Sequence, residues 1–523
     1  MRYVTTGKQM KEIDRYTMEE VGIPSMVLME RAAWAFVEEI RGALKKTDRI
    51  WVACGTGNNG ADGVAAARML TLEGFRPVIL LAGDAERGTE EFKAQLAIAR
   101  KLGVPVFETE DFIPGKCEVI LDAVFGVGLS RPIEGAYREF MEMLAAQSPR
   151  FTAAIDVPSG IHSDSGQVMG IALKADVTVT FGYEKLGCLL YPGRLYCGRL
   201  VTADIGFPKS ALEQGMAGGE KYAMALDDGD LGEIPRRQRD ANKGTYGKLL
   251  IVAGSKGMSG AAYMSALAAY RTGAGLCRIL TDEENRAILQ GQIPEAVLLT
   301  YDGARAEADG EAFKEMVAGA VKQDTAIVLG PGLGRSEASR LLVETVLEQA
   351  FVPVVLDADG LNLVAEHPHF TNYFTENIIV TPHVGEMARL TKKSAEEIKA
   401  DPVGTARTYA DIYGVTCVLK DAATVIAGRD GELYINRSGC PAMAKAGSGD
   451  VLSGVIAGLL ALGLEDVKAA AMGVYLHGRA GEVAAERTGS HGLLAHETAD
   501  AVPAVMEAAC AARTEEAGGR ERG

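Results

Sequence analysis

Residues 49–63 read RIWVACGTGNNGADG, and this stretch decides the fold of the first part of the chain. The apolar run 49–54 predicts a strand, the glycine-rich run 55–63 predicts a tight turn, and the run 64–70 predicts a helix. In such a unit, glycine lets backbone N–H groups and the helix N-terminus approach a phosphate closely. Taken alone, the turn is equally compatible with a polar cap that binds nothing.

The same alternation continues on both sides of this stretch. Strands are predicted at residues 77–81, 118–122, 151–156 and 176–181, separated by amphipathic helical runs, and this order is typical of parallel βαβ units. Several of these strands end in Gly or Asp, where an open α/β sheet places its ligand crevice. We therefore expect an α/β fold whose first domain, residues 1–215, is a doubly wound, Rossmann-like, three-layer αβα domain.

The alternation stops over residues 210–244, which are rich in Gly, Asp, Pro and Arg and predict a linker. It restarts with predicted strands at residues 248–253, 276–280, 325–329, 352–357, 378–381 and 415–420. This restart predicts a second α/β domain, residues 225–512. The Glu-, Arg- and Gly-rich tail, residues 513–523, is predicted to be disordered.

Composition limits the possible function classes. The 523 residues are 47% apolar, which is enough for two buried cores, and the formal charge of −16 argues against broad nucleic-acid binding. The eight cysteines are dispersed without a CxxC pair, so we expect neither a zinc site nor a disulfide framework, and a reducing cytoplasm fits best. The longest apolar run, residues 451–464, is too short to span a bilayer and predicts a buried helix. We expect no membrane partner and a homo-oligomer.

Polar residues follow three of the predicted strands. Asn59, Asp122, Asp156 and Ser159 are expected to converge on one crevice, because parallel strands end at the same edge of a sheet. Two carboxylates beside amide and carbonyl oxygens suit a hard cation, while a further group performs proton chemistry. A single Asp at a strand end is more often a helix cap.

Several separated motifs occur in one order over residues 1–210: MKEIDRYTMEEVGIPSMVLMERA, GTGNNGADG, DAVFGVGLSRP, IDVPSGI, ADVTVTFGYEKLG and DIGFP. Together they resemble the NAD(P)H-hydrate epimerase family. The resemblance implies a potassium ion held by Asn59, Asp122 and Ser159, and a substrate-contacting acid or base at Asp156. It also implies that hydrated NADH or NADPH (NADHX, NADPHX) binds residues of two loops, namely Asn58, Asn59, Gly60, Ala61, Asp62, Gly126, Val127, Gly128, Leu129, Ser130, Arg131 and Pro132.

Residues 445–452 of the second domain read KAGSGDVL, immediately before the apolar helical run. Small residues there let a helix N-terminus approach a phosphate, and Asp450 is placed to take a proton from an attacking hydroxyl. The spacing resembles the signature of ribokinase-like enzymes. The alternative is a plain turn with an Asp cap.

Other segments weaken that alternative: residues 242–262, LGPGLG, DADGLN, TPHVGE, LKDAAT and HGLLAHETADAVP occur in one order. Together they resemble the ADP- or ATP-dependent NAD(P)H-hydrate dehydratase family, which implies a magnesium requirement. Asn242 stands where that family usually has His. The resemblance implies substrate contacts from Ala261, Gly332, His383 and Asp450, and nucleotide contacts from Lys420, Asp421, Ala422, Ala423, Thr424 and Gly449.

The combined expectation is a bifunctional repair enzyme, an isomerase and a lyase. It would interconvert the R and S forms of hydrated NAD(P)H and dehydrate the S form with consumption of ADP or ATP. One alternative is a ribokinase-like vitamin-precursor kinase, which would accumulate a stable phosphorylated product. In that alternative, the first domain would be a non-catalytic binding domain.

Overall fold

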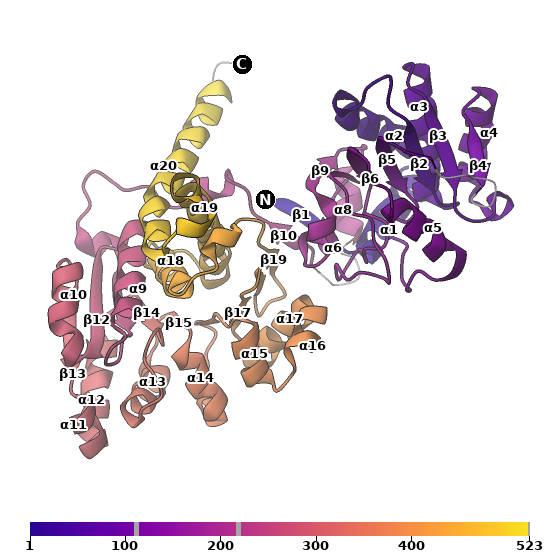
Figure 1. The fold of residues 1–523 in the computed structure, drawn as a ribbon. Coiled ribbons are helices and arrows are strands. Elements are labelled where there is room, and N and C mark those ends of the chain that lie inside the picture. Colours follow the sequence, from indigo (N-terminus) through magenta and orange to yellow (C-terminus); the bar gives the residue numbers. More distant parts are fainter. Residues whose placement is uncertain (109–114, 216–220, 521–523) are drawn as a thin grey trace. The chain divides into compact units, whose positions relative to one another are not determined.

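The computed structural model describes residues 1–108, 115–215 and 221–520 and divides into two compact units (Figure 1). The N-terminal unit comprises Tyr3–Ala223. The C-terminal unit comprises Met224–Gly523 together with Met1–Arg2. The boundary falls inside the segment 210–244 that the sequence predicted to be a linker.

A parallel sheet forms the centre of the N-terminal unit, with the strand order β4-β3-β2-β5-β6-β7-β9. The chain runs outward from β2 to β4 and then returns to place β5 on the other side of β2. The topological switch point therefore lies between β2 and β5, where open α/β sheets bind their ligands. The strands are β2 (Ile50–Cys54), β3 (Pro77–Leu81), β4 (Val106–Glu108), β5 (Val119–Ala123), β6 (Phe151–Ile155), β7 (Val177–Phe181) and β9 (Arg199–Ala203).

Helices cover both faces of this sheet. One core cluster joins buried residues of α2, α3 and α4 to β2, β3 and β5, and a second joins α5 to the opposite face. Every residue of β2 is buried, as expected for a central strand between two helical layers. The helices are α2 (Ser25–Ile40), α3 (Asn58–Leu72), α4 (Glu90–Lys101), α5 (Gly135–Ala145), α6 (Leu186–Leu189), α7 (Arg194–Cys197) and α8 (Lys209–Gly215).

The chain begins with a strand–helix unit that the sequence did not separate from the next helix. Strand β1 (Arg2–Thr5) pairs with the two-residue strand β8 (Glu184–Lys185), with Thr5 opposite Lys185. Helix α1 (Gly7–Glu19) follows directly and is started by a capping box between Thr6 and Gln9. This register places α1 beside Lys185.

The C-terminal unit is built on a sheet with the order β13-β12-β11-β14-β15-β16-β17-β18-β19. The pairs from β13 to β17 are parallel, and β17, β18 and β19 are antiparallel to one another in turn. The strands are β11 (Lys248–Val252), β12 (Leu276–Asp282), β13 (Val297–Tyr301), β14 (Ala326–Leu329), β15 (Val354–Leu356), β16 (Ile378–Val380), β17 (Thr416–Leu419), β18 (Val425–Ala427) and β19 (Leu433–Ile435).

Helices α9, α18, α19 and α20 gather on one face of this sheet, and α12, α13 and α14 lie on the other (Figure 1). The helices are α9 (Ser259–Thr272), α10 (Arg286–Gln292), α11 (Gly303–Ala308), α12 (Gly310–Val321), α13 (Glu337–Gln349), α14 (Asp359–Glu366), α15 (Val384–Thr391), α16 (Ala395–Ala400), α17 (Pro402–Tyr413), α18 (Ser448–Ala461), α19 (Asp466–Gly492) and α20 (Ala495–Arg520).

The predicted fold class is confirmed in both units, and each strand predicted from the sequence is present within one or two residues at its ends. The apolar run 451–464 is largely the buried helix α18, and no helix of the described residues is long and apolar enough to cross a membrane.

Two segments differ from expectation. The predicted linker contains α8, β10 (Ala223–Ala225) and two short 3-10 helices, Asp230–Glu233 and Lys243–Tyr246. Helix α20 extends to Arg520, whereas the sequence predicted disorder from residue 513, and residues 521–523 lie outside the described residues. Ala, Glu and Arg favour helix, so this segment continues a helix that has already been nucleated.

Candidate active sites

A cavity of about 530 Å³ opens at the switch point of the N-terminal sheet. Its walls come from α1, α2, the start of α3 and the loop after β5. The predicted residues that line it are Asn58, Asn59, Asp62, Gly126, Val127, Gly128, Leu129 and Asp156. Gly60 and Ala61 are buried in the first turn of α3, and Ser130, Arg131 and Pro132 continue the same loop beyond Leu129.

Glycine is required where the loops after β2 and β5 meet. A Cβ at Gly55 would lie 2.3 Å from the carbonyl oxygen of Val124, and one at Gly60 would lie 1.8 Å from the carbonyl oxygen of Gly55. Real Cβ atoms do not approach so closely, so the backbone must stay bare there. This contact holds the start of α3 against the end of β5 and shapes the cavity floor.

Behind this loop lies a buried polar cluster. Asp122 Oδ1 accepts a hydrogen bond from Ser159 Oγ at 2.5 Å, and Asp122 Oδ2 accepts one from Ser159 N at 2.8 Å. Ser159 Oγ is also 2.8 Å from Phe125 N, and Asn59 Oδ1 lies against Gly126. The structure thus links all three residues predicted to hold a cation through the loop after β5.

One observation in this cluster fits a cation. Burial raises the pKa of Asp122 to about 6, and no basic side chain pairs with it within the described part of the chain. Amide, hydroxyl and carboxylate oxygens are suitable ligands for a hard cation, whose charge would offset the desolvation of Asp122.

Asp156 is held in an uncommon backbone conformation at the end of β6, with φ of +65°. Its Oδ1 accepts hydrogen bonds from Lys185 Nζ at 2.6 Å, Thr180 Oγ1 at 3.0 Å and Phe181 N at 3.3 Å. The Lys185 side chain is 1% exposed. Within the described residues, Asp156 Oδ2 receives no donor, so one oxygen is fixed and the other remains available.

Two charged residues of this cavity had no role in the sequence interpretation. Lys185 and Asp14 both line it, and their motifs, GYEKLG and MKEIDRY, were noted only as family signatures. Burial raises the pKa of Asp14 to about 6, with a lowering effect of Lys185 and a raising effect of Asp156. Burial also raises the pKa of Asp62 well above its usual range. The cavity therefore combines one buried ion pair with two carboxyls biased toward the neutral form.

In the C-terminal unit, Asp450 lies in the first turn of α18, after Gly447 with φ of +90°. Its backbone carbonyl accepts a hydrogen bond from Ser265 Oγ at 3.0 Å, which ties the start of α18 to α9. Burial raises the pKa of Asp450 to about 7, and Asp357 adds to this effect while Lys420 opposes it. A carboxylate with that proton affinity at a helix N-terminus suits a general base near neutral pH.

Lys420 occupies the interior beside this carboxylate. Its Nζ donates to Asp357 Oδ1 at 2.6 Å, and Asp357 Oδ2 accepts from Ser453 Oγ of α18 at 2.7 Å. A Cβ at Gly449 would lie 3.4 Å from Lys420 Nζ. Lys420, predicted to contact nucleotide, thus forms a partly buried ion pair beside the GSGD turn, with its own side chain 18% exposed and that of Asp357 1% exposed. The sequence analysis noted the motif DADGLN but did not identify Asp357 as a site residue or its pairing with Lys420.

His383 caps α15. Its Nδ1 accepts from Gly385 N at 2.9 Å, and its backbone N–H donates to Glu386 Oε2 at 2.8 Å. A parallel bridge joins His383 to Lys420, the residue that also influences Asp450. Burial raises the pKa of Glu386 to about 7, a second shifted carboxyl that the sequence interpretation missed.

The remaining predicted residues fall into two places. A Cβ at Gly332 would lie 2.8 Å from Ala261 Cβ, so these two positions form one narrow contact. Asp421, Ala422, Ala423 and Thr424 form the turn between β17 and β18, closed by Thr424 Oγ1 donating to the Asp421 carbonyl at 3.3 Å.

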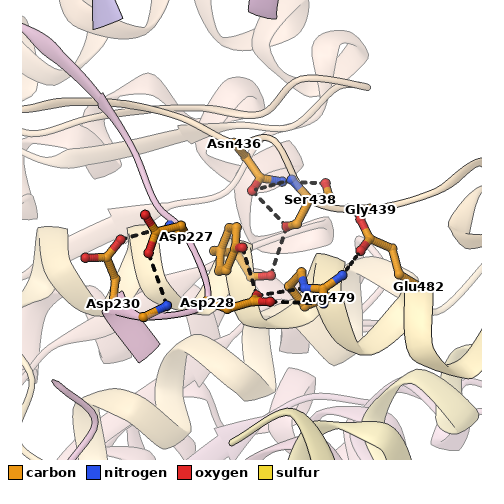
Figure 2. A network of polar contacts seen from close by, with 10 residues as sticks. Asp227, Asp228, Asp230, Asn436, Ser438, Gly439, Arg479 and Glu482 are labelled. Carbon is orange, nitrogen blue, oxygen red and sulfur yellow. Dashed lines mark hydrogen bonds and ion pairs between the residues drawn. The ribbon is translucent and has the colours of Figure 1, made fainter. Parts of the chain in front are cut away.

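The loop that leads from β19 toward the GSGD turn is fastened to α19 (Figure 2). Gly439 N donates to Glu482 Oε1 at 2.7 Å, and Ser438 Oγ donates to the Tyr475 carbonyl at 2.8 Å. Between these two positions of α19, Arg479 Nε donates to Asp228 Oδ1 at 2.8 Å. Asp228, in the segment predicted as a linker, therefore helps to hold the helix that supports this loop.

These features define a two-domain α/β enzyme: an open-sheet unit with a cavity at its switch point, and a unit with a glycine-flanked Asp at the start of a buried helix. Two family models match the chain: "YjeF-related protein N-terminus" over residues 25–187 and "NAD(P)H-hydrate dehydratase" over residues 249–504. Each model covers the site of one unit.

Full-length relatives carry both parts. The bifunctional NAD(P)H-hydrate repair enzyme of Thermofilum pendens is 37% identical over 97% of this chain and 96% of its own length. That of Escherichia coli is 34% identical over 92% and 90%. A crystal structure of the ADP/ATP-dependent NAD(P)H-hydrate dehydratase from Bacillus subtilis, co-crystallised with ATP/Mg²⁺, is 32% identical over 54% of this chain and 97% of that chain, with a TM-score of 0.47. The chain belongs to the family of bifunctional NAD(P)H-hydrate repair enzymes.

Proposed function

We propose that the N-terminal unit interconverts the R and S epimers of hydrated NADH and NADPH, and that the C-terminal unit dehydrates the S epimer with ADP or ATP. The observation that carries this proposal is that each unit has its own cluster of shifted carboxyls around a buried lysine. Each cluster lies in or beside the segment that the corresponding family model matches.

For the epimerase, Asp156 is the proposed acid or base. Asp156 lines the cavity, and Lys185 fixes its Oδ1. The substrate loops would be the residues after β2 and β5, in which bare glycine backbone allows close approach. Inverting the ring carbon that bears the hydroxyl requires such a group to move a proton as a ring bond opens or water leaves.

A potassium ion is proposed for the cluster of Asn59, Asp122 and Ser159. The buried Asp122 carboxyl, which has no basic partner among the described residues, supports a cation there, with the side-chain oxygens of Asn59 and Ser159 as the further ligands. When bound, the ion would supply positive charge that stabilises the ionised form of Asp122 and fixes the loop after β5.

For the dehydratase, Asp450 is the proposed base that takes the proton of the substrate hydroxyl as that oxygen accepts a phosphoryl group. Phosphate leaves more readily than hydroxide, so the nucleotide has a clear chemical purpose. The start of α18 presents backbone N–H groups to the negative charge that grows in this step. Ala261, Gly332 and His383 are the proposed substrate contacts.

The turn of residues 420–424 and Gly449 are the proposed nucleotide site. The Bacillus subtilis dehydratase was co-crystallised with ATP/Mg²⁺, which supports a nucleotide with magnesium here. Bound magnesium would screen the phosphate charges. Lys420 opens this turn, and its pairing with Asp357 holds its side chain beside Gly449 of the same proposed site.

We also propose that the enzyme acts in a reducing cytoplasm as a homo-oligomer. All eight cysteines are unbridged in the structure, and six of them are buried. Light scattering of the purified chain tests the oligomeric state.

The decisive experiment follows the absorbance of reduced cofactor formed from a mixture of R and S hydrates, with ADP, with ATP and with neither. We expect complete conversion with a nucleotide and magnesium, and release of free phosphate. Accumulation of a stable phosphorylated product would instead indicate a kinase.

A further inference from the structure

A second carboxyl of the N-terminal cavity, Asp14, is placed to share the proton chemistry of Asp156. Asp14 lies on α1, and the pairing of β1 with β8 brings α1 beside Lys185. Asp14, Asp156 and Lys185 all line the cavity of about 530 Å³. Three elements that are far apart in sequence therefore deliver two carboxyls and one ammonium to a single space.

The two carboxyls have different surroundings. Asp156 is ion-paired to Lys185 at 2.6 Å and accepts two more hydrogen bonds on the same oxygen. Asp14 has neither an ion pair nor a hydrogen bond within the described residues, and burial raises its pKa to about 6. Because Asp156 has one oxygen fixed by Lys185 and the other without a donor, it suits the base, and the desolvated Asp14 suits the acid.

We infer that Asp14 is a catalytic acid of the epimerase, acting together with Asp156 as the base. This inference rests on the proposed function. The hydroxyl on C6 gives its proton to Asp156 Oδ2, its O–H electron pair forms a carbonyl, and the C6–N1 bond breaks. The electron pair of that bond stays on N1 and takes the proton of Asp14. After rotation of the open chain, the reverse transfers close the ring on either face and restore both carboxyls.

The charges around Asp14 set the direction of its pH dependence. Lys185 of β8 lowers the pKa of Asp14, and Asp156 at the end of β6 raises it. Asp62 of α3 interacts electrostatically with Asp14, and Lys11 of the same helix as Asp14 lines the cavity. Helix α8 packs against α1, and its Lys209 and Glu213 are exposed. Asp14 donates only while protonated, so kcat/KM for epimerisation should fall as pH rises above about 6.

The test is Asp14→Asn in the full chain, measured with the purified R epimer and corrected for the rate without enzyme. We expect kcat to fall by about a hundredfold or more, with KM changed much less, and the fall of kcat/KM above the Asp14 pKa to disappear. Asp14→Glu should restore part of both. Glu19→Gln, which removes a 63% exposed carboxylate from the same helix, should change neither.

Dehydration of the pure S epimer by the same variants should keep the wild-type rate, because that reaction is proposed for the C-terminal unit. An Asp14→Asn enzyme with the wild-type rate and pH profile would overturn the inference, as would a slower enzyme that keeps the wild-type fall at high pH. If that fall disappears only in Asp62→Asn, the acid is Asp62 instead. Absence of epimerisation in the wild-type chain would refute the proposed function itself.

Discussion

In both units a lysine Nζ lies 2.6 Å from an aspartate Oδ1. The carboxylate that is proposed to react stands in a different position relative to this pair in each unit. In the N-terminal unit the reacting Asp156 is itself the partner of Lys185. In the C-terminal unit Lys420 pairs with Asp357, and the reacting Asp450 stands beside the pair without one. The ion pair therefore includes the reacting carboxylate in the N-terminal unit, whereas in the C-terminal unit it lies beside Asp450, whose pKa burial raises to about 7.

The largest expected effect separates the two sites completely. Asp450→Asn removes the proposed base of the C-terminal unit, so the dehydration rate should fall by about 10³-fold or more while epimerisation persists. Both rates are measured on pure epimers. Asp430→Asn, which neutralises a 72% exposed carboxylate between β18 and β19, is the matched control and should leave both rates unchanged. Joint loss of both activities in folded Asp450→Asn would contradict the comparison.

The two lysines should differ in their effect on chemistry but not on stability. Lys185→Met and Lys420→Met each leave a buried carboxylate unpaired, and each should lower the free energy of unfolding by about 3–5 kcal/mol. Only Lys185→Met should abolish its reaction, because its partner is the reacting group. Urea unfolding and both assays check this, with Lys468→Met, which breaks an exposed ion pair, as control. Equal losses of activity in the two variants would remove the distinction.

The two reactions should respond to pH in opposite directions. Asp450 must be ionised to accept a proton, so kcat/KM for dehydration should fall by about tenfold per pH unit below its pKa. The pKa of Asp450 is about 7, and Lys420 lowers it, so in Lys420→Met the fall in kcat/KM should begin at a higher pH. Glu386→Gln should leave the pH at which this fall begins unchanged. If that pH changes in Glu386→Gln and not in Lys420→Met, the base is assigned to the wrong carboxyl.

The smallest expected effect is on stability of the N-terminal unit. Potassium should raise its unfolding temperature by about 2–4 °C, because a weakly bound cation contributes about 1 kcal/mol. The shift should be absent in Asn59→Ala and Asp122→Asn, and sodium or magnesium should not reproduce it. Differential scanning calorimetry in matched chloride salts measures it. An equal shift in Asp122→Asn would show that potassium acts elsewhere.

The strands and the glycine-rich loops were predictable because their signals are local. Apolar runs such as IWVAC alternate with amphipathic helical runs, and glycines follow them. These glycines are required because the loops approach each other too closely for a Cβ atom. The geometry joining Asp122 to Ser159 followed from the rule that parallel strands end at one sheet edge.

The residues that were missed depend on long-range pairing. Lys185 belongs to a strand of only two residues, and its place follows from the register with β1, which no local pattern encodes. Asp14 reaches the cavity only because that register positions α1. The pairing of Asp357 with Lys420, 63 residues away, was also missed, while the predicted nucleotide contact of Lys420 stays a prediction. Ion pairs between separate strands cannot be read from spacing.

Mixing two single variants tests most directly whether the chain holds two independent sites. Asp156→Asn should leave the R epimer untouched and Asp450→Asn should convert it only to the S epimer, so neither alone forms reduced cofactor from R. An equimolar mixture of the two proteins, with ADP and magnesium, should restore its formation from R. A mixture that stays inactive, although each variant keeps its one remaining activity, would contradict this account.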